Sequence, residues 1–479
     1  MRIEKNYIAG AWVESAAANT IDVVNPATVE TIAQVPEGCA ADVDAAVRAA
    51  VEAQASFGRT TPAEREALLR RILECYRDRA EDIAQVICDE VGTPLQQSRD
   101  VQAFLGIAHL EKVLEVMPDY PYERLRGGTL VVRDPIGVSG LITPWNVPIN
   151  QIATKVYPAI AAGCATVLKP SEVAPLNARI FAEVLHEAGV PKGVFNLVHG
   201  VGHTVGAALT AHPDIRMVSF TGSTRAGIEI ARSAAITVKR VAQELGGKSA
   251  NVLLDDCDFA VAVRKGALSC FSNTGQACSS PTRMLVPRDR LEEACRHAAA
   301  AAEALVVGDP RGAATEMGPL VNQAQYERVQ AMIETGIREG ARLVAGGPGR
   351  PDGLDASVAL GFFVRPTVFA DVDPAMTIAQ QEIFGPVLSI IAYRDEEEAV
   401  AIANGTAYGL AAYVQSGELA RARRFARRLE AGRVHINYPD LDRLAPFGGF
   451  KQSGNGRENG RYGIDEFTEL KALIGYGSR

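Results

Sequence analysis

The chain has 479 residues, more than one hydrophobic core usually serves, so we expect at least two large domains. Hydrophobic residues make up 47% and charged residues 22%, proportions typical of a soluble globular protein. The net charge of −8, with no compensating basic cluster, argues against nucleic acid as a main partner.

Eight cysteines are scattered without the spacing of metal ligands or of a disulfide framework, which favours a reducing, intracellular compartment. The first residues lack the apolar run of a signal peptide. The longest apolar segment, Val156 to Leu168, is too short to span a bilayer. We therefore predict a cytoplasmic protein with no metal site and no membrane partner.

The N-terminal part of the chain predicts short strands followed by helices. Thr61-Pro62-Ala63-Glu64 combines a capping box with proline at the first helical position, and it starts a predicted helix that runs toward Glu90. Further on, two β-prone runs between Tyr122 and Asp134 surround a Gly-Gly pair, the pattern of a hairpin. An isolated hairpin is only marginally stable in water, so this one needs a packing partner.

Strands and helices alternate from Gly137 to Gly246. Repeated units of this kind with apolar strands predict a doubly wound parallel sheet, whose ligands bind beyond the carboxyl ends of the strands. The predicted strands are 138–142, 165–169, 195–198, 217–221 and 239–244, and the predicted helices between them are 149–162, 175–188, 203–211 and 223–234.

Three loops follow strands of this sheet, at 143–148, 169–172 and 220–224, and the third opens a helix whose free N–H groups could hold a pyrophosphate. The segment 200–206 is only a loose glycine-rich match, and no standard dinucleotide-binding fingerprint is present. These residues leave two interpretations open: a nucleotide site, or glycines that serve tight turns between strand and helix.

A second α/β unit is predicted from Gly246 to about Leu441, with strands and helices in alternation. An arginine-rich run near its end predicts the solvated face of an amphipathic helix, with Phe425 and Leu429 turned inward. The tail is short and β-prone. The predicted strands are 251–254, 283–286, 362–369 and 386–393, with a helix over 291–306 and the tail at 467–476.

A periodic apolar run from Phe259 to Phe271 predicts a helix that ends in a polar Asn-Thr-Gly segment. Cys278 follows at once, flanked by small residues that leave its sulfur uncovered. A thiol in such a place can be a nucleophile if its surroundings stabilise the thiolate. Most cysteines are small buried hydrophobic residues, so a structural role stays open on this segment alone.

A second segment, Gln243-Glu244-Leu245-Gly246-Gly247-Lys248, places a carboxylate in an otherwise apolar strand before two glycines. Burial there would raise the pKa of Glu244 toward the range of a general base. This segment and Gly275-Gln276-Ala277-Cys278, in this order, resemble the two signatures of the aldehyde dehydrogenase superfamily. The similarity runs over nearly the whole chain, from Asn25 to Lys451 and beyond.

The resemblance implies an α/β fold with two doubly wound parallel-sheet domains, a Rossmann-like cofactor domain and a catalytic domain, plus a small β element for oligomerisation. The implied limits are 1–119 and 138–246 for the cofactor domain, 247–445 for the catalytic domain, and 120–137 with 462–479 for the β element. A homodimer or homotetramer would give the hairpin and the tail their packing partner.

The resemblance also implies a reaction: oxidation of a small-molecule aldehyde to the carboxylic acid through a thiohemiacetal and a thioester, with NAD or NADP as the oxidant. Cys278 matches the nucleophile, Glu244 the base that activates water, and Asn146, with the N–H of Cys278, the oxyanion hole. Lys155 and Glu458 match a proton-relay pair of some members.

For the cofactor, Lys169 and Glu172 match the ligands of the adenosine ribose, and the charge of Glu172 would repel a 2′-phosphate, which favours NAD. Gly222 and Ser223 match the pyrophosphate contact, and Glu382 the ligand of the nicotinamide ribose. The predicted cofactor contacts are Ile142, Thr143, Pro144, Trp145, Lys169, Ser171, Glu172, Gly202, Gly206, Phe220, Thr221, Gly222, Ser223, Glu244, Leu245, Gly246, Glu382 and Phe384.

The places that form the family's aldehyde tunnel hold several polar residues, which predicts an aromatic or polar-substituted aldehyde, or a semialdehyde, rather than a long alkyl one. The alternative stays open that some of these side chains point elsewhere or into solvent. The predicted tunnel walls are Val147, Gln151, Thr154, Ala277, Ser279 and Phe447, and further polar residues at these places are Asn150, Ser272, Asp442 and Arg443.

Other functions fit the pattern less well. A CoA-acylating semialdehyde dehydrogenase would keep Cys278 but need not keep Glu244. A cysteine hydrolase needs a histidine base, and none of the seven histidines lies in a recognisable pairing signature. A non-catalytic descendant of the fold would be expected to have lost Cys278, Asn146 or Glu244, and all three are present.

Overall fold

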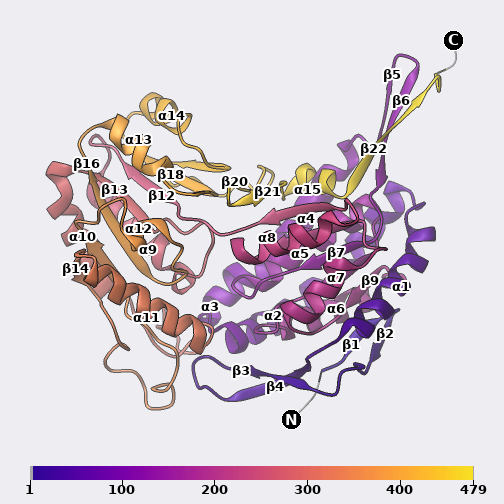
Figure 1. Cartoon of the computed structure of the whole chain (residues 1–479), viewed down its shortest axis with the longest axis horizontal. Helices are drawn as coiled ribbons and strands as arrows, with labels where there is room; N and C mark the ends of the chain where they lie inside the picture. The colour runs from indigo at the N-terminus through magenta and orange to yellow at the C-terminus, as the bar shows by residue number, and fades with distance from the viewer. Residues whose placement is uncertain (1–3, 478–479) are drawn as a thin grey trace.

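A computed structural model gives the structure of residues 4–477. Two large sheets lie in two halves of the molecule, each covered by helices, and a small third sheet stands away from them beside the C-terminus (Figure 1). The predicted α/β fold class, with two doubly wound sheets and a small β element, is confirmed. In the part of the chain that the structure describes, no helix has both the length and the apolar character needed to cross a bilayer.

The first large sheet contains eight strands from the described residues, in the order β2-β1-β9-β8-β7-β10-β11-β21. Strands β9, β8, β7, β10 and β11 run parallel, whereas β2, β1 and β21 are antiparallel additions at the two edges. The predicted parallel strands are therefore confirmed. Their bounds are β1 Asn6–Ile8, β2 Ala11–Val13, β7 Ser139–Ile142, β8 Thr166–Lys169, β9 Phe195–Leu197, β10 Met217–Thr221, β11 Arg240–Glu244 and β21 Gly454–Asn455.

Helices cover both faces of this sheet. Side chains alternate along a strand, so Leu141 belongs to the core that includes α2, α4, α5 and α6, whereas its neighbour Ile142 belongs to the core that includes α1, α7 and α8. The predicted helix over 203–211 is in part a π-helical turn, because Val205 and Gly206 both donate their N–H to the carbonyl of Val201. The bounds are α1 Ala40–Phe57, α2 Pro62–Val91, α4 Phe104–Val116, α5 Pro148–Ala162, α6 Leu176–Glu187, the π turn Gly202–Gly206, α7 Ala207–Ala211 and α8 Thr224–Ala235.

The second large sheet has seven strands within residues 4–477, in the order β14-β15-β16-β13-β12-β18-β19, of which only β14 runs antiparallel. Helices α9 and α10 cover one face, and α11 to α14 the other. The bounds are β12 Ala250–Leu253, α9 Phe259–Phe271, β13 Arg283–Pro287, α10 Leu291–Glu303, α11 Gln323–Arg338, β14 Arg342–Ala345, β15 Thr367–Ala370, α12 Thr377–Gln380, β16 Val387–Tyr393, α13 Glu396–Asn404, β18 Ala411–Gln415, α14 Leu419–Ala426 and β19 Arg433–Ile436.

Two predicted elements of this unit are shorter than expected. The strand predicted over 362–369 begins only at Thr367, because the N–H of Phe362 bonds the carbonyl of Pro26 instead of a neighbouring strand. The helix predicted over 291–306 ends at Glu303, and the N–H of Val306 then donates to the Glu316 carboxylate.

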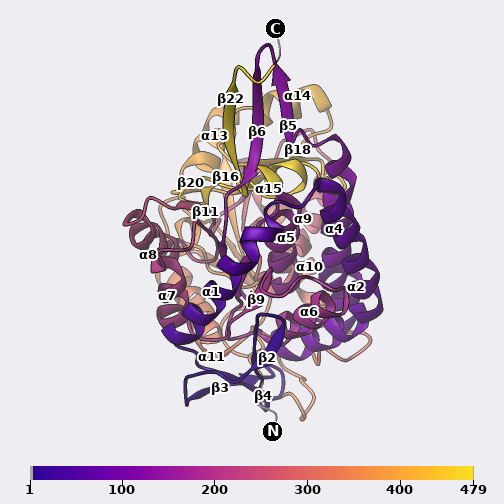
Figure 2. The same cartoon turned by 90° about the vertical axis from the view of Figure 1, so that its right-hand side faces the viewer.

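The third sheet has the order β22-β6-β5 and joins the predicted hairpin to the predicted tail. Strand β22 pairs with β6 along its whole length, and both Figure 1 and Figure 2 place this sheet at the end of the molecule that carries the C-terminus. Leu125, Leu470 and Ile474 are exposed on it. The bounds are β5 Glu123–Arg126, β6 Thr129–Pro135 and β22 Thr468–Ile474.

Short elements connect these parts, and the domain limits given above stay a prediction. The residues of strand β21 lie outside every predicted domain. The strand nevertheless belongs to the first sheet, because it pairs with Gln243 and Glu244 of β11. The remaining bounds are β3 Thr20–Val24, β4 Thr31–Pro36, α3 Leu95–Gln97, β17 Tyr408–Gly409, β20 Phe450–Lys451 and α15 Gly460–Glu466.

Candidate active site

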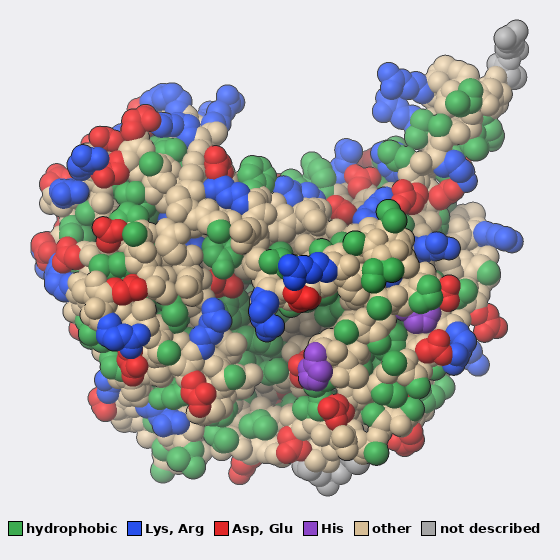
Figure 3. All heavy atoms as spheres, viewed as in Figure 1, with side chains coloured by type: hydrophobic (Ala, Val, Ile, Leu, Met, Phe, Trp, Pro, Cys, Tyr) green, Lys and Arg blue, Asp and Glu red, His purple; other side chains and the backbone are tan. Residues whose placement is uncertain are grey.

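Two pockets meet between the large sheets, and Figure 3 shows a hollow near the middle of one face of the molecule. The first pocket, about 170 Å³, is bounded by the loops that follow β7, β10 and β11, by the segment after α9 and by α11. It is lined by Pro144, Trp145, Asn146, Gln151, Thr221, Gly222, Ser223, Glu244, Leu245, Gly246, Cys278, Gln325, Arg328, Glu382 and Phe384.

The second pocket, about 240 Å³, shares Asn146, Gln151 and Cys278 with the first, so Cys278 lies where the two meet. All six predicted tunnel walls line it, together with Asn150 and Arg443. Its full lining is Leu105, His109, Asn146, Val147, Asn150, Gln151, Thr154, Ala277, Cys278, Ser279, Tyr413, Arg433, His435, Leu441, Arg443, Phe447, Glu458 and Asn459.

Two polar residues expected near the tunnel, Ser272 and Asp442, do not line this pocket. Both are exposed. Gln97 donates a hydrogen bond to the Ser272 hydroxyl, and the Asp442 carboxylate accepts the N–H of Leu444 at 2.9 Å. Hydrogen bonds with Gln97 and Leu444, which lie outside the lining, therefore keep these two side chains out of the cavity.

A strained loop positions Cys278. Asn273 and Thr274 adopt the left-handed region, with φ of 51° and 56°, which is uncommon for residues other than glycine. The Asn273 amide donates to the carbonyls of Asn146 (3.0 Å) and Gln276 (3.3 Å). These hydrogen bonds offset the strain and tie the nucleophile loop to the loop after β7.

Cys278 is half-buried at the junction of the pockets, so its sulfur is more covered than its small neighbours predicted. Burial, reinforced by the carboxylates of Glu382 and Glu244, raises the pKa of Cys278 to about 12. The groups of the protein thus hold the sulfur as a neutral thiol near pH 7, the opposite of what a nucleophile needs. An additional positive charge beside the sulfur is required to form the thiolate.

We expect iodoacetamide to alkylate Cys278 slowly near neutral pH, with a rate that rises about tenfold per pH unit, because only the thiolate reacts and the pKa lies far above this range. Peptide mass spectrometry over a pH series measures the rate at Cys278. Cys270, fully buried in α9, serves as an internal control that stays unmodified. Fast alkylation of Cys278 that does not change with pH would contradict this expectation.

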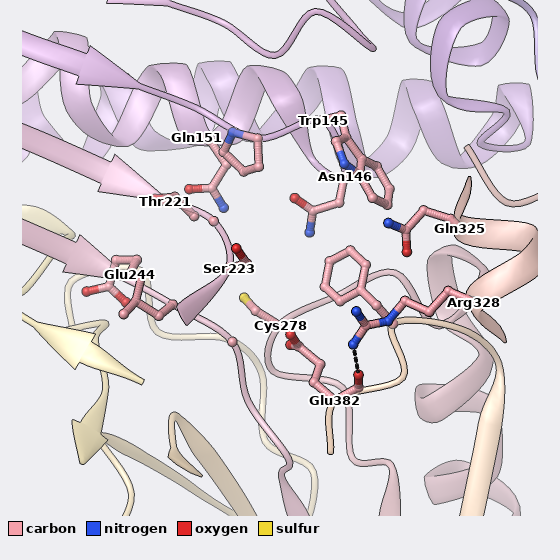
Figure 4. A pocket seen from close by; sticks show the side chains of 15 residues that line it. Trp145, Asn146, Gln151, Thr221, Ser223, Glu244, Cys278, Gln325, Arg328 and Glu382 are labelled. Atoms are coloured by element: carbon pink, nitrogen blue, oxygen red, sulfur yellow. Dashed lines mark hydrogen bonds between the residues drawn. The ribbon is translucent and has the colours of Figure 1, made fainter. Parts of the chain in front are cut away.

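The amide of Asn146 lies above Cys278 and points into the same space (Figure 4). One of its N–H groups donates to the carbonyl of Gln276 at 2.9 Å, which leaves the second N–H free to bind an oxygen. Within residues 4–477 no hydrogen bond occupies the N–H of Cys278. Two donors beside the sulfur are the arrangement that stabilises an oxyanion.

Glu244 ends β11 and is 4% exposed, yet neither of its carboxylate oxygens has a hydrogen-bond partner in the described part of the chain. Burial, and then the neighbouring Glu458 carboxylate, raise the pKa of Glu244 well above its usual value, as expected from the sequence. Figure 4 shows its carboxylate to one side of Cys278 and not directed at the sulfur. A buried, unpaired acid of this kind is typical of a functional site.

The predicted pair of Lys155 and Glu458 is present as a buried, short ion pair. Backbone hydrogen bonds in both directions between Glu458 and Phe447 hold it beside the second pocket. Its charges act on Glu244 with opposite signs: Glu458 raises and Lys155 lowers the pKa of that carboxyl group. The three ionisable groups therefore form one electrostatic cluster.

The predicted cofactor contacts divide into two groups. Ten of them line the first pocket: Pro144, Trp145, Thr221, Gly222, Ser223, Glu244, Leu245, Gly246, Glu382 and Phe384. The others lie outside its lining: Ile142, Thr143, Lys169, Ser171, Glu172, Gly202, Gly206 and Phe220. The first pocket thus corresponds to one part of the predicted cofactor surface.

Among the outer group, Lys169 and Glu172 bond each other. The Lys169 ammonium donates to the Glu172 carboxylate at 2.7 Å and to the carbonyl of Pro170 at 2.9 Å. Burial lowers the pKa of Lys169, and Glu172 opposes that shift. A ribose at this place would meet a preformed ion pair rather than two separate side chains.

Glu382 fits closely against the two glycines that follow Glu244. Its carboxylate accepts the N–H of Gly247 at 3.0 Å, and a Cβ atom at Gly246 would come within 2.5 Å of it. Phe384, in the left-handed region at φ 61°, packs edge-on against Trp145 with 5.3 Å between ring centroids. The Gly-Gly pair therefore makes room for the carboxylate, which a side chain would displace.

Several pocket residues were absent from the predictions. Gln325 and Arg328 lie on α11, a helix that we did not predict. The Arg328 guanidinium donates to the backbone carbonyl of Glu382 at 2.6 Å (Figure 4). The buried side-chain amide oxygen of Gln325 has no partner among the described residues. In the second pocket the missed residues are Leu105, His109, Tyr413, Arg433, His435, Leu441 and Asn459. Gln325 and Arg328 lie one turn apart at the start of an amphipathic helix, and this pattern could have predicted them from the sequence. The missed residues of the second pocket have no such pattern.

No group of three or more His, Cys, Asp or Glu side chains arranged to hold a metal ion occurs among the described residues.

Comparison with known proteins agrees with this site. The model of the "Aldehyde dehydrogenase family" matches residues 12–473. A 3-succinoylsemialdehyde-pyridine dehydrogenase of a Pseudomonas species is 51% identical over 471 residues, 98% of either chain. A cysteine-to-alanine mutant of aldehyde dehydrogenase C from Pseudomonas syringae, solved with NAD+ and octanal, has 52% identity and a TM-score of 0.98, over 99% of this chain and 97% of that one.

A Mycobacterium tuberculosis aldehyde dehydrogenase, solved with NAD+, is 41% identical with a TM-score of 0.95, over 98% of both chains. Both comparisons extend over almost the full length, and the family match spans the two segments that carry Glu244 and Cys278. The chain therefore belongs to the aldehyde dehydrogenase family.

Proposed function

We propose that this chain oxidises an aldehyde to the carboxylic acid with NAD+, and that Cys278 forms the covalent intermediate. The observation that carries the proposal is the position of Cys278 at the junction of the two pockets, within reach of two oxyanion donors. One pocket would receive the oxidant and the other the aldehyde, so that both meet at one sulfur.

The residues of the first pocket fit the nicotinamide half of NAD+. The N-terminal turn of α8 presents free N–H groups after Gly222, the hydroxyl of Thr221 is buried without a partner among residues 4–477, and Gly246 leaves a cradle beside the Glu382 carboxylate. Lys169 and Glu172 would hold the adenosine end. When bound, NAD+ supplies a positive ring near the thiol and accepts the hydride.

The protein residues then have distinct roles. The Cys278 thiolate attacks the aldehyde carbon, and the oxyanion so formed accepts hydrogen bonds from the Asn146 amide and the Cys278 N–H. Loss of hydride leaves a thioester on Cys278. Glu244 takes a proton from a water molecule that adds to this thioester, and the acid departs as the thiolate is released. Lys155 and Glu458 would pass the proton on toward solvent.

Formation of NADH and of free acid from a panel of aldehydes tests this function. The CoA-acylating alternative is not favoured, because Glu244 is in place; it would show as a requirement for CoA and an acyl-CoA product. The non-catalytic alternative is not favoured either, and it would show as no NADH with any aldehyde.

NAD is the proposed cofactor in preference to NADP, because the Glu172 carboxylate would face a 2′-phosphate. Lys169 neutralises the Glu172 carboxylate only in part, because only one of its two oxygens accepts a hydrogen bond from the Lys169 ammonium. Glu172→Gln should raise the kcat/KM ratio of NADP to NAD by about tenfold through removal of like-charge repulsion. A wild-type enzyme that prefers NADP would refute the proposal.

A homodimer or homotetramer is the proposed assembly, with the three-stranded sheet as the contact. This sheet projects from the body and exposes Leu125, Leu470 and Ile474, which a neighbouring subunit would cover (Figure 1). Light scattering that gives a stable monomer of 51.0 kDa would count against it. A cytoplasmic location is also proposed, supported by eight cysteines that are all free thiols.

A further inference from the structure

Two arginines in the second pocket lack the anionic partners that arginine usually has. Arg433 and Arg443 form no ion pair with a carboxylate within residues 4–477, and the Nε of each is buried without a hydrogen-bond acceptor. The one side-chain hydrogen bond of Arg433 among the described residues is long, 3.3 Å, from Nη2 to the carbonyl of Ala445. A half-buried guanidinium that lacks an anion is costly, so two of them in the wall of one pocket point to an anionic ligand.

Aromatic rings hold the two guanidiniums in the pocket wall. Arg433 lies 5.0 Å from the ring centroid of Phe447, and Arg443 lies 5.8 Å from that of Phe104. Stacking of this kind fixes a guanidinium in place while leaving the N–H groups at its edge free to donate. The two cations are thus oriented without being neutralised.

The remaining titratable groups of the pocket do not supply the missing negative charge. Burial, together with Arg443 and Arg433, lowers the pKa of His109 to about 4, and its ring bonds the Asn150 amide at 2.7 Å. Burial and Arg433 likewise lower the pKa of His435 to about 4. Both rings are therefore neutral near pH 7.

Glu244 also acts on Arg433 and has no partner among the described residues, but burial raises the pKa of its carboxyl group well above the usual value, which favours the neutral acid. The other two carboxylates near the pocket are committed elsewhere. Glu458 lines it but is bound to Lys155. Asp442 is close enough to act on Arg433, yet it is exposed, forms no ion pair among the described residues, and caps the N–H of Leu444. The second pocket therefore carries a net positive charge.

We propose that the second pocket binds aldehydes that bear a carboxylate remote from the aldehyde carbon, and that Arg433 and Arg443 receive this carboxylate. The inference rests on the proposed function, because the same cavity is lined by Cys278, which takes the aldehyde end. Leu105, Leu441 and the ring of Tyr413 provide apolar walls for the body of the molecule between the two ends. The octanal bound by the Pseudomonas syringae relative has no such group.

The test compares two aldehydes that differ in charge but share a ring: para-carboxybenzaldehyde and its methyl ester. The wild-type enzyme should favour the carboxylate in kcat/KM by about tenfold or more, because charge-assisted bonds to arginine are lost with the ester. Arg443→Gln should bring this ratio close to one, mainly through KM of the charged substrate. Arg443→Lys keeps the charge but not the two-pronged geometry, and should recover part of the preference.

Two further variants complete the test, one expected to increase the ratio and one expected to leave it unchanged. Asp442→Asn removes a negative charge that acts on Arg433 and should increase the preference for the carboxylate. Arg461→Gln removes an exposed arginine that lies over Tyr462, outside the pocket lining, and should leave the ratio unchanged. Should Arg443→Gln fail to fold, Arg433→Gln provides the same comparison.

Binding without turnover separates this inference from the proposed function. Calorimetry with the Cys278→Ala protein should detect terephthalate, which carries a carboxylate at both ends, and the added Arg443→Gln change should weaken its binding about tenfold or more. A wild-type enzyme that uses the ester as well as the acid, or an Arg443→Gln variant that loses both equally, would overturn the inference. Absence of NADH with every aldehyde would instead refute the proposed function, and terephthalate binding would still decide the role of the arginines.

Discussion

Replacement of Cys278 by alanine should abolish aldehyde oxidation and leave NAD+ binding nearly intact. Of the three described residues that line both pockets, Cys278 alone carries a nucleophile for the aldehyde carbon, and removal of its sulfur leaves the walls of both pockets in place. Loss of a catalytic nucleophile lowers kcat by about ten-thousandfold or more. Steady-state NADH formation measures the loss, and fluorescence titration with NADH measures binding.

Cys270→Ala is the matched control. Burial raises the pKa of both Cys270 and Cys278 to about 12, so the acidity of the thiols does not distinguish them, whereas their positions do. Cys270 is 0% exposed in α9 and lines neither pocket. Its replacement should lower the free energy of unfolding by about 1–2 kcal/mol and leave kcat near the wild-type value. Substantial turnover by Cys278→Ala would show that another residue is the nucleophile.

Glu244→Gln should release one equivalent of NADH and then stall. Glutamine keeps the size of the buried side chain but cannot accept the proton of water, so the thioester should form on Cys278 and persist. Rapid mixing shows the burst, and intact-protein mass spectrometry shows the acyl-enzyme. The raised pKa of Glu244 adds a pH dependence: deacylation by the wild type should become faster as the pH rises and the carboxylate forms.

Glu466→Gln is the control for this prediction. Burial raises the pKa of Glu466 as well, but its carboxylate accepts the N–H of Arg457 and it lines neither of the two pockets. This variant should keep steady turnover and the rise of rate with pH. An unchanged steady-state rate in Glu244→Gln would mean that another group activates water.

The sequence determined those features that depend on residues close together in the chain. The capping box at Thr61 and Glu64 starts α2 as predicted, and the apolar period from Phe259 to Phe271 gives α9 its observed limits. Glu244 and Cys278 could be found for the same reason, since each lies in a short segment whose residue types are unusual. Helix and strand propensity, helix capping and turn formation depend on residues within a few positions of each other, so they can be predicted from a single sequence.

The tertiary structure alone decided which distant residues share a cavity. His109, Tyr413 and Arg433 come from separate segments, and no local pattern marks them as neighbours. The resemblance to the family also implied that Ser272 and Asp442 line the tunnel, and the structure leaves both outside it. Whether a polar side chain faces a pocket or solvent depends on how whole helices and loops pack. That packing is fixed by contacts between residues hundreds of positions apart, and those contacts have no periodic signature in the chain.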